Sequence, residues 1–228
     1  PGSTITLIRQ GGSPGQGGTF KWYTGSCGGT LAGTGDSLTV SPYSNKTYYL
    51  RAESSCGNTA CITKSIMVLP VPTASISAGG RTTFCNGGNV ILYANTGSGL
   101  TYQWKKNNTS INGATGPSFI ATTNGNYKVT VTNIFGCSKI SNTINVTVNP
   151  LPAAVITAGG PTTFCAGDSV MLTANSGTGL SYQWRKNGNA ISGATNISFA
   201  AKEAKNYTCL VTNSNSCKKT SNTITTTI

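Results

Sequence analysis

Cysteine is the residue type in this sequence with the most chemistry to offer. The 228 residues include eight cysteines but no histidine, and the four acidic residues are spread along the chain. General acid–base catalysis uses histidine or paired carboxylates, and a zinc site needs histidines or clustered cysteine pairs. We therefore expect no enzymatic activity, no metal site and no cofactor. The chemistry left to explain is cysteine cross-linking, which points to an oxidising compartment outside the cytoplasm.

The cysteines belong to a repeat with a period of 80 residues. Laid over one another at this offset, residues 71–148 and 151–228 agree at about half of their positions without a gap. The pairs that mark the repeat are Cys85 and Cys165, Trp104 and Trp184, Tyr127 and Tyr207, and Cys137 and Cys217. Each copy must therefore be interpreted as one folding module.

The order of motifs in each copy is typical of an immunoglobulin-like β-sandwich. In the second copy, an alternating apolar strand at 170–174 is followed by Tyr-Gln-Trp184 and then by Asn-Tyr207-Thr-Cys209, which is the order of strands B, C and F. Trp22 occupies the same strand-C position near the start of the chain, and we interpret the tryptophans as core residues rather than a platform for sugar rings. The sequence predicts an all-β fold of three tandem immunoglobulin-like β-sandwiches in a head-to-tail rod.

Two proline-containing linkers, at 69–72 and 149–152, separate the modules. Proline holds the backbone extended and does not fit a central strand, so linkers of this kind space neighbouring modules semi-rigidly. We define module 1 as residues 1–70, module 2 as 71–150 and module 3 as 151–228. Module 1 lacks the first strand of the sandwich, and we expect the chain to be a piece of a longer one. Strands are expected at 4–8, 20–23, 37–40, 47–52 and 61–68 in module 1, and at 73–78, 89–94, 101–106, 118–123, 126–133 and 138–148 in module 2.

Two cysteine positions can be interpreted within single modules. Cys56 and Cys61 flank the turn between the last two strands of module 1, so a local bridge between them is expected. Cys209 occupies the strand-F position where immunoglobulin domains carry a cysteine, but the partner position on strand B is Ala174. Apolar packing therefore replaces the usual inter-sheet disulfide, and we expect Cys209 to be a free, buried thiol.

The repeated cysteines allow two pairing schemes. Equal spacing favours bonds within modules, Cys85 with Cys137 and Cys165 with Cys217. In a sandwich these positions lie at opposite ends, about 20 Å apart by strand length, whereas a disulfide needs Cα atoms within about 7 Å. In a head-to-tail rod Cys27 would instead reach Cys137, Cys85 would reach Cys217, and Cys165 would remain for a following module. We favour this inter-module scheme, and the intra-module scheme stays open.

The chain is strongly basic, with a formal net charge of +12 from 16 basic and four acidic residues. Such a balance suits acidic polymers. Lys105, Lys106, Arg185 and Lys186 directly follow the strand-C tryptophans and form a repeated basic stripe, the first candidate for contacting surface glycans or acidic polysaccharide. A solvated sheet edge explains the same pattern. We expect no nucleic-acid partner, and no direct membrane insertion because no apolar run approaches membrane-spanning length.

Several short motifs carry a family resemblance. Modules 2 and 3 share Thr-Thr-Phe-Cys-x-Gly, Tyr-Gln-Trp-x-Lys-Asn, Ile-x-Gly-Ala-Thr and a closing Cys-x-Lys, and they resemble the immunoglobulin-like repeats of very large secreted proteins of Bacteroidota. Module 1, with Trp22-Tyr-Thr-Gly-Ser-Cys-Gly-Gly-Thr and Thr47-Tyr-Tyr-Leu-Arg-Ala, resembles a second module type that accompanies them. The resemblance covers nearly the whole chain, and it brings no active-site motif.

The resemblance implies an extracellular or bacterial cell-surface location. Proteins of this kind are commonly exported by the type IX secretion route, so the secretion machinery is an implied partner during export, and they include surface adhesins linked to gliding. Bacteria of this group also O-glycosylate Ser or Thr in Asp-Ser/Thr-apolar motifs. Ser37, after Asp36, and Ser169, after Asp168, match that motif and are candidate modification sites.

The leading hypothesis is a non-enzymatic structural or adhesive stalk segment of a large bacterial cell-surface or secreted adhesin, with neighbouring modules of the same chain as its partners. The alternative is a glycan- or polyanion-binding module appended to a secreted protein or to a polysaccharide-degrading enzyme. Convergence of exposed aromatic or basic residues in one groove would favour the alternative. Fold alone does not separate the two, because function lies in sites carried by folds.

Overall fold

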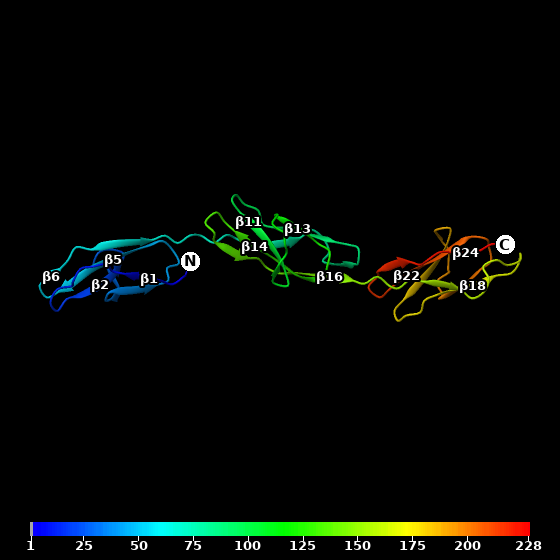
Figure 1. Cartoon of the computed structure of the whole chain (residues 1–228), viewed down its shortest axis with the longest axis horizontal. Helices are drawn as coiled ribbons and strands as arrows, with labels where there is room; N and C mark the ends of the chain where they lie inside the picture. The colour runs from blue at the N-terminus through cyan, green and yellow to red at the C-terminus, as the bar shows by residue number, and fades with distance from the viewer. Residues whose placement is uncertain (1) are drawn as a thin grey trace. The chain divides into compact units, whose positions relative to one another are not determined.

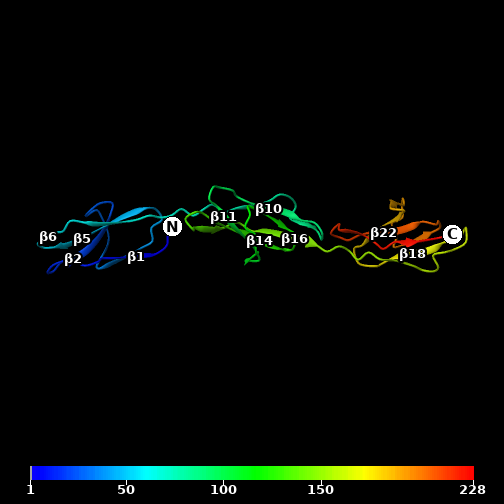
Figure 2. The ribbon, with the colours of Figure 1, turned by 45° about the horizontal axis from the view of Figure 1, so that its top comes forward.

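The computed structural model describes residues 2–228 and contains only strands, turns and loops over that range. Figures 1 and 2 accordingly show arrows and connecting loops but no coiled ribbon. The all-β fold class is therefore confirmed. In the same range, no helical segment has the length and apolarity needed to cross a membrane.

Backbone contacts divide the chain into two compact units. One contains the residues up to Ala74 together with Thr96–Tyr102 and Thr130–Ile140, and the other contains Ser75–Asn95, Gln103–Val129 and Ser141–Ile228. Two segments of module 2 thus group with module 1, whereas the rest of module 2 groups with module 3. Within the described residues, each sheet nevertheless takes all its strands from a single module.

Module 1 folds into two sheets. One pairs β1 with β4 antiparallel, and the other has the order β3-β2-β5-β6, with β7 also paired to β5. The strands are β1 (Ile5–Ile8), β2 (Thr19–Thr24), β3 (Thr30–Thr34), β4 (Ser37–Val40), β5 (Lys46–Ser54), β6 (Gly57–Asn58) and β7 (Ile62–Ile66). All five expected strands are present, and β3 and β6 are additional short ones.

The core of module 1 follows from alternation along its longest strand. In β5, Tyr48, Leu50 and Ala52 are buried while the residues between them are partly exposed. Trp22 packs against this row, and its indole N–H donates to the carbonyl oxygen of Gly35 at 3.0 Å. A buried tryptophan needs such a partner for its one polar group. Trp22 is therefore a core residue and no sugar platform.

Module 2 has the two layers of an immunoglobulin-like sandwich (Figures 1 and 2). One sheet has the order β13-β10-β8, and the other has the order β12-β11-β14-β16-β9, with β15 also paired to β14. The strands are β8 (Ile76–Ala78), β9 (Thr83–Cys85), β10 (Val90–Ala94), β11 (Thr101–Lys106), β12 (Thr109–Ser110), β13 (Ser118–Ala121), β14 (Gly125–Thr132), β15 (Ser138–Ile140) and β16 (Ile144–Asn149). The first five expected strands are found within a few residues of their predicted bounds, whereas the strand expected at 138–148 is split into β15 and β16.

Module 3 repeats this arrangement. Its sheets have the orders β17-β18-β21 and β20-β19-β22-β23, with β24 also paired to β22. The strands are β17 (Ile156–Ala158), β18 (Val170–Ala174), β19 (Ser181–Lys186), β20 (Asn189–Ala190), β21 (Ser198–Ala201), β22 (Asn206–Thr212), β23 (Lys218–Thr220) and β24 (Ile224–Thr225). Trp184, Leu172 and Val211 are completely buried between the two sheets.

A tyrosine near the start of strand F anchors the preceding loop in both repeats. The hydroxyl of Tyr127 donates to the carbonyl oxygen of Thr123 at 2.9 Å, and that of Tyr207 donates to the carbonyl oxygen of Glu203 at 3.3 Å. Both tyrosines are 1% exposed. This contact is the tyrosine corner of immunoglobulin-like domains.

The last strand of each repeat is broken, and the break links the two sheets. In module 2, Asn142 accepts a hydrogen bond from the backbone N–H of Ile76 at 2.8 Å and donates to its carbonyl oxygen at 3.0 Å. Ile76 begins β8, which belongs to the opposite sheet. Asn222 makes the same two contacts with Ile156 in module 3. These amides cross-link the sheets where no inter-sheet disulfide is present among the described residues.

Candidate functional site

A disulfide joins modules 2 and 3 inside the second compact unit. Cys85 is bonded to Cys217, with Cα atoms 5.6 Å apart and a sequence separation of 132. The structure therefore brings together one of the inter-module pairs and does not form the intra-module pair Cys165–Cys217. Cys85 ends the short strand β9, which pairs in parallel with β16 so that Cys85 lies opposite Asn149. This pairing brings Cys85 to the start of the linker.

The partner turn is shaped by an asparagine. Asn213 accepts hydrogen bonds through Oδ1 from the backbone N–H groups of Asn215, at 3.1 Å, and of Cys217, at 3.0 Å. Its Nδ2 donates to the carbonyl oxygen of Pro150 in the linker at 2.9 Å. One side chain therefore fixes the turn that carries Cys217 and ties that turn to the linker.

The same contacts recur one repeat earlier, inside the first compact unit, around Asn133. We call this arrangement of an asparagine, a cysteine turn and a linker carbonyl the asparagine clamp. Asn133 accepts from the N–H groups of Phe135 and Cys137 and donates from Nδ2 to the carbonyl oxygen of Pro70 at 2.8 Å. Cys137, however, is a free thiol here. It lies beside an open hollow lined by residues of module 1, including Ile5 and Pro42.

Module 1 closes its own disulfide, which corrects two sequence-based pairings. Cys27 is bonded to Cys61, with Cα atoms 5.8 Å apart. The expected pairs Cys56–Cys61 and Cys27–Cys137 are therefore not formed, and Cys56 is free and exposed. Cys27 follows β2 and Cys61 directly precedes β7, and both strands pair with β5. This common neighbour brings the two cysteines to the same end of the sheet.

Two further cysteines are free but differ in their surroundings. Cys209 is completely buried in the core of module 3, as expected from its apolar partner position. Burial raises the pKa of the Cys209 thiol, so it remains protonated and unreactive. Cys165 is free and exposed.

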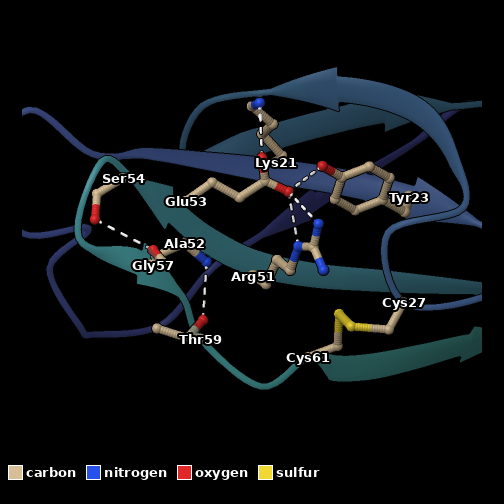
Figure 3. A network of polar contacts seen from close by, with 10 residues as sticks. All are labelled: Lys21, Tyr23, Cys27, Arg51, Ala52, Glu53, Ser54, Gly57, Thr59 and Cys61. Carbon is tan, nitrogen blue, oxygen red and sulfur yellow. Dashed lines mark hydrogen bonds and ion pairs between the residues drawn. A yellow bond between two sulfur atoms is a disulfide. The ribbon is translucent and has the colours of Figure 1, made fainter.

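The carboxylate of Glu53 in module 1 is surrounded by three donors (Figure 3). Lys21 Nζ lies 2.8 Å from Oε2, Arg51 donates from Nε to Oε1 at 2.7 Å, and the hydroxyl of Tyr23 donates to Oε1 as well. These contacts, with the hydrogen bond from Lys21 the largest cause, lower the pKa of Glu53 from 4.5 to about 2. Glu53 is therefore ionised at physiological pH and cannot act there as a general acid.

Strand register explains why these side chains meet. β2 and β5 pair so that Lys21 lies opposite Arg51, one pleat from Glu53. Residues two apart on a strand share one face, so Lys-x-Tyr on β2 and Arg-x-Glu on β5 converge on the outer face, opposite the core that holds Trp22. The cluster is a charge-assisted clamp between two neighbouring strands.

The turn that follows β2 lies over this cluster. A Cβ atom on Gly28 would lie 2.9 Å from a guanidinium nitrogen of Arg51, and the φ angle of Gly28 is +76°, so this position requires glycine. The Cys27–Cys61 bond lies beside the cluster and fixes the turn (Figure 3). The guanidinium also lies over the ring of Tyr23, 5.1 Å from its centroid, as a cation–π contact.

The repeated basic stripe does not converge. Lys105 and Lys106 are successive residues of β11, and so are Arg185 and Lys186 on β19, so the members of each pair point to opposite faces. All four are half-buried. Lys106 Nζ donates to the hydroxyl of Thr123 at 2.7 Å, and Lys186 makes an ion pair at the equivalent place.

The ion pair of module 3 joins Lys186 to Glu203. Lys186 Nζ lies 2.7 Å from Oε1 of Glu203, and this contact raises the pKa of Lys186 and lowers that of Glu203. Lys106 and Lys186, two of the four basic residues of the stripe, thus bind side chains of the loop before strand F. The geometry gives them an internal structural role.

The two candidate glycosylation serines are both exposed. Ser37 is the first residue of β4, after Asp36, whose carboxylate accepts a hydrogen bond from Arg9 Nε at 2.5 Å. Ser169 precedes β18 and lines an open hollow at one end of module 3. Access therefore poses no obstacle to modification at either residue.

Module 1 is similar to a known family of protein domains. Module 1 matches the family model described as Ig-like domain CHU_C associated, over residues 1–70. The match extends over less than a third of the chain. It agrees with the two-sheet arrangement of this Ig-like module. No curated protein sequence matches the chain.

Solved structures of tandem immunoglobulin-like domains are similar to the chain at low identity. The titin I-band fragment I67–I69 is 13% identical, with a TM-score of 0.46 over 99% of this chain and 92% of that one. Extracellular domains 3–5 of Drosophila OTK are 15% identical, with a TM-score of 0.39 over 99% and 91%. Murine CEACAM1b is 22% identical, with a TM-score of 0.33 over 68% and 98%. The chain's own strand order and tyrosine corners define the sandwich.

Sequence reasoning missed two features of these sites. The Glu53 clamp was visible only as Lys-x-Tyr and Arg-x-Glu on neighbouring strands, a pattern that gains meaning once the register is known. The asparagine clamp had a stronger signal. Asn133 and Asn213 each precede a repeated cysteine by four residues, at the 80-residue offset.

Proposed function

We propose that this chain is a non-enzymatic structural segment of a large secreted or cell-surface protein, in which immunoglobulin-like modules space and connect other parts. The observation that carries the proposal is the Cys85–Cys217 disulfide, which joins two successive modules. A covalent link between neighbouring domains adds nothing to catalysis or recognition by itself, but it limits their separation under tension. We retain 1–70, 71–150 and 151–228 as the proposed module boundaries, since each sheet stays within one of them.

The proposed location is extracellular, on the surface of a bacterium of the Bacteroidota, after export by the type IX route. Two disulfides in one chain support an oxidising compartment. The family match of module 1 and the repeated motifs of modules 2 and 3 support the bacterial assignment. The partners under this proposal are neighbouring modules, with the secretion machinery during export.

Pulling on the two ends of the oxidised chain tests the structural role. Force passes through a disulfide, so the residues between Cys85 and Cys217 form a closed loop that cannot extend, even when they unfold. Their 132-residue separation corresponds to about 440–475 Å of extended chain. We expect the fully unfolded length to increase by this amount after reduction, on top of a smaller gain from Cys27–Cys61. Equal lengths before and after reduction would contradict the proposal.

A matched variant makes this measurement specific. Cys217→Ser should show the longer extension without reduction, whereas Cys56→Ser, at an exposed free thiol, should behave like the original chain. The two variants have the same number of substitutions and the same chemistry. Any difference between them therefore reports the link between modules 2 and 3.

Glycan binding, the alternative role, is tested separately. The oxidised chain is applied to a glycan array and to heparin, at low and at physiological salt. Retention only at low salt is the result expected of a diffusely basic surface. Retention on one glycan class at physiological salt would place a recognition site on these modules and overturn the purely structural proposal.

A further inference from the structure

The junction between modules 2 and 3 has two sides, and the end of module 3 repeats one of them. The crevice at the existing junction is lined by Arg81–Cys85, Asn89 and Asn149, and by Asn215 and Ser216 from the turn of module 3. At the other end of module 3 an open hollow is lined by residues that include Pro161, Thr163, Phe164 and Ser169. Positions 81, 83, 84 and 89 of the first surface correspond to 161, 163, 164 and 169 of the second. We call the surface of module 2 around Cys85, which contacts the turn of module 3, the receiving side. An equivalent surface is present at the end of module 3, and no turn of the described residues lies against it.

Part of the backbone frame of this receiving side is already formed in module 3. At the existing junction, Thr147 lies opposite Thr83 in parallel pairing, and the N–H of Thr147 donates to the carbonyl oxygen of Thr82 at 2.8 Å. In module 3, Thr227 lies opposite Thr163 in the same parallel sense, and its N–H donates to the carbonyl oxygen of Thr162 at 2.9 Å. The first of the three paired positions of β9 therefore recurs in module 3, two residues before Cys165.

The two cysteines on these segments differ in having a partner. Cys85 is bonded to the turn of the following module, whereas Cys165, its equivalent, is a free and exposed thiol. We propose that the end of module 3, with Cys165 and the hollow around Phe164, is the receiving half of a second disulfide-linked junction. Its occupant is a further repeat of the same type, joined through a linker after Ile228, with an Asn-x-x-x-Cys turn. This inference deepens the proposed structural role and rests on it.

A linked repeat fits this surface better than a free second copy of the chain. The cysteine turn of module 3 reaches Cys85 because Asn213 holds the linker carbonyl of Pro150. In a second copy, Cys217 is already bonded, and Cys137 lies beside a hollow lined by residues of its own module 1. A module that follows a linker of the same length would therefore present a free cysteine turn to Cys165 in the geometry of the existing junction.

The bond would form by thiol–disulfide exchange with a small-molecule disulfide as the oxidant. The thiolate of Cys165 attacks one sulfur of the small disulfide, which releases one small thiolate and leaves a mixed disulfide. The thiolate of the incoming cysteine then attacks the Cys165 sulfur and releases the second small thiolate. The two protein sulfurs lose two electrons in total, the small disulfide gains them, and the protons of the two protein thiols pass to the released thiolates.

The test appends a second copy of residues 149–228 directly after Ile228, so that the natural linker and turn follow module 3. The fusion chain is refolded with oxidised and reduced glutathione, free thiols are alkylated, and disulfide-linked peptides are mapped by mass spectrometry. We expect a bond between Cys165 and the appended copy of Cys217 in most molecules. The appended copy of Cys165 should be alkylated instead, because no further turn is available to it.

Two variants of the fusion chain complete the test. Replacing the appended copy of Cys217 by serine should return Cys165 to full alkylation, and Cys137→Ser should leave the new bond unchanged. The native Cys85–Cys217 bond in the same sample reports folding and oxidation. If that bond forms while Cys165 remains alkylated, the second junction is refuted and the structural role stands. If Cys85–Cys217 itself is absent, the proposed function fails first.

Discussion

Asn213 donates a hydrogen bond from its side-chain amide to the carbonyl oxygen of Pro150, 2.9 Å away and 63 residues earlier in the chain. The same amide group, through its oxygen, shapes the turn that carries Cys217. One uncharged side chain thus connects linker geometry to disulfide formation. The equivalent contact between Asn133 and Pro70 indicates that the clamp belongs to the repeat rather than to one junction.

Replacing Asn213 should loosen the junction before it affects the sandwich. Asn213→Ala removes three hydrogen bonds, two within the turn and one to the linker, each worth about 0.5–1.5 kcal/mol net. We expect the Cys85–Cys217 bond to be reduced at a roughly tenfold lower ratio of reduced to oxidised glutathione. Redox titration with thiol alkylation measures the shift. Asn215→Ala is the control, because its backbone N–H keeps the bond to Asn213. Equal shifts in both variants would show that the asparagine clamp has no special role.

The lowered pKa of Glu53 predicts that module 1 loses stability in acid. Its folded pKa of about 2 lies below its ordinary value of 4.5, so the stabilisation is fully present above about pH 4.5 and is lost as pH falls toward 2. We expect the melting temperature of module 1 to fall over that window in the original chain. Glu53→Gln should lower the melting temperature at pH 7 and flatten the decline.

A second glutamate supplies the control for this pH profile. The pKa of Glu203 is also lowered, mainly by a hydrogen bond from Lys186, but its side chain is 54% exposed, against 16% for Glu53. Exposed ion pairs contribute little, so Glu203→Gln should change the profile less. Calorimetry from pH 7 to pH 2 compares the variants. A larger effect of Glu203→Gln would contradict the assignment.

Cysteine variants of module 1 can distinguish the observed pair, Cys27–Cys61, from the expected pair, Cys56–Cys61. Cys27→Ser opens a loop with a sequence separation of 34 residues and should destabilise module 1 by about 2–4 kcal/mol. Cys56→Ser changes an exposed free thiol and should stay within about 0.5 kcal/mol. Hydrogen exchange of β5 peptides measures both. Had Cys56 been the partner of Cys61, the two variants would exchange places.

Variants of Cys209 test whether apolar packing replaces the usual inter-sheet disulfide in the core of module 3. Its equivalent in module 2 is Val129, also completely buried, so Cys209→Val should change the stability of module 3 by less than about 1.5 kcal/mol. Cys209→Ser buries a hydroxyl in an apolar site and should cost about 1–3 kcal/mol. Chemical denaturation ranks the variants. In the original chain, iodoacetamide should label Cys165 in the folded state and Cys209 only after unfolding; labelling of folded Cys209 would contradict its burial.

The amino-acid sequence by itself determined the repeat, the strands and the core. Alternation along 170–174, the position of Trp184 and the Tyr-x-Cys of strand F each depend on contacts a few residues away or on a fixed strand period. These local patterns defined the sandwich, the burial of the tryptophans and the free thiol at Cys209. The expectation of no enzymatic activity likewise rested on residue types alone, namely the absence of histidine and the scattered acidic residues.

Only the tertiary structure decided which distant groups meet. Cys61 pairs with Cys27 rather than with nearby Cys56 because strands β2 and β7 share β5 as a neighbour. Glu53 meets Lys21 because of strand register, and Cys85 meets Cys217 because β9 pairs with β16 beside the linker. Register and strand order are set by the packing of the whole sheet. A pairwise contact across 132 residues therefore leaves no local pattern in the sequence, although the 80-residue repeat shows where its second copy should be sought.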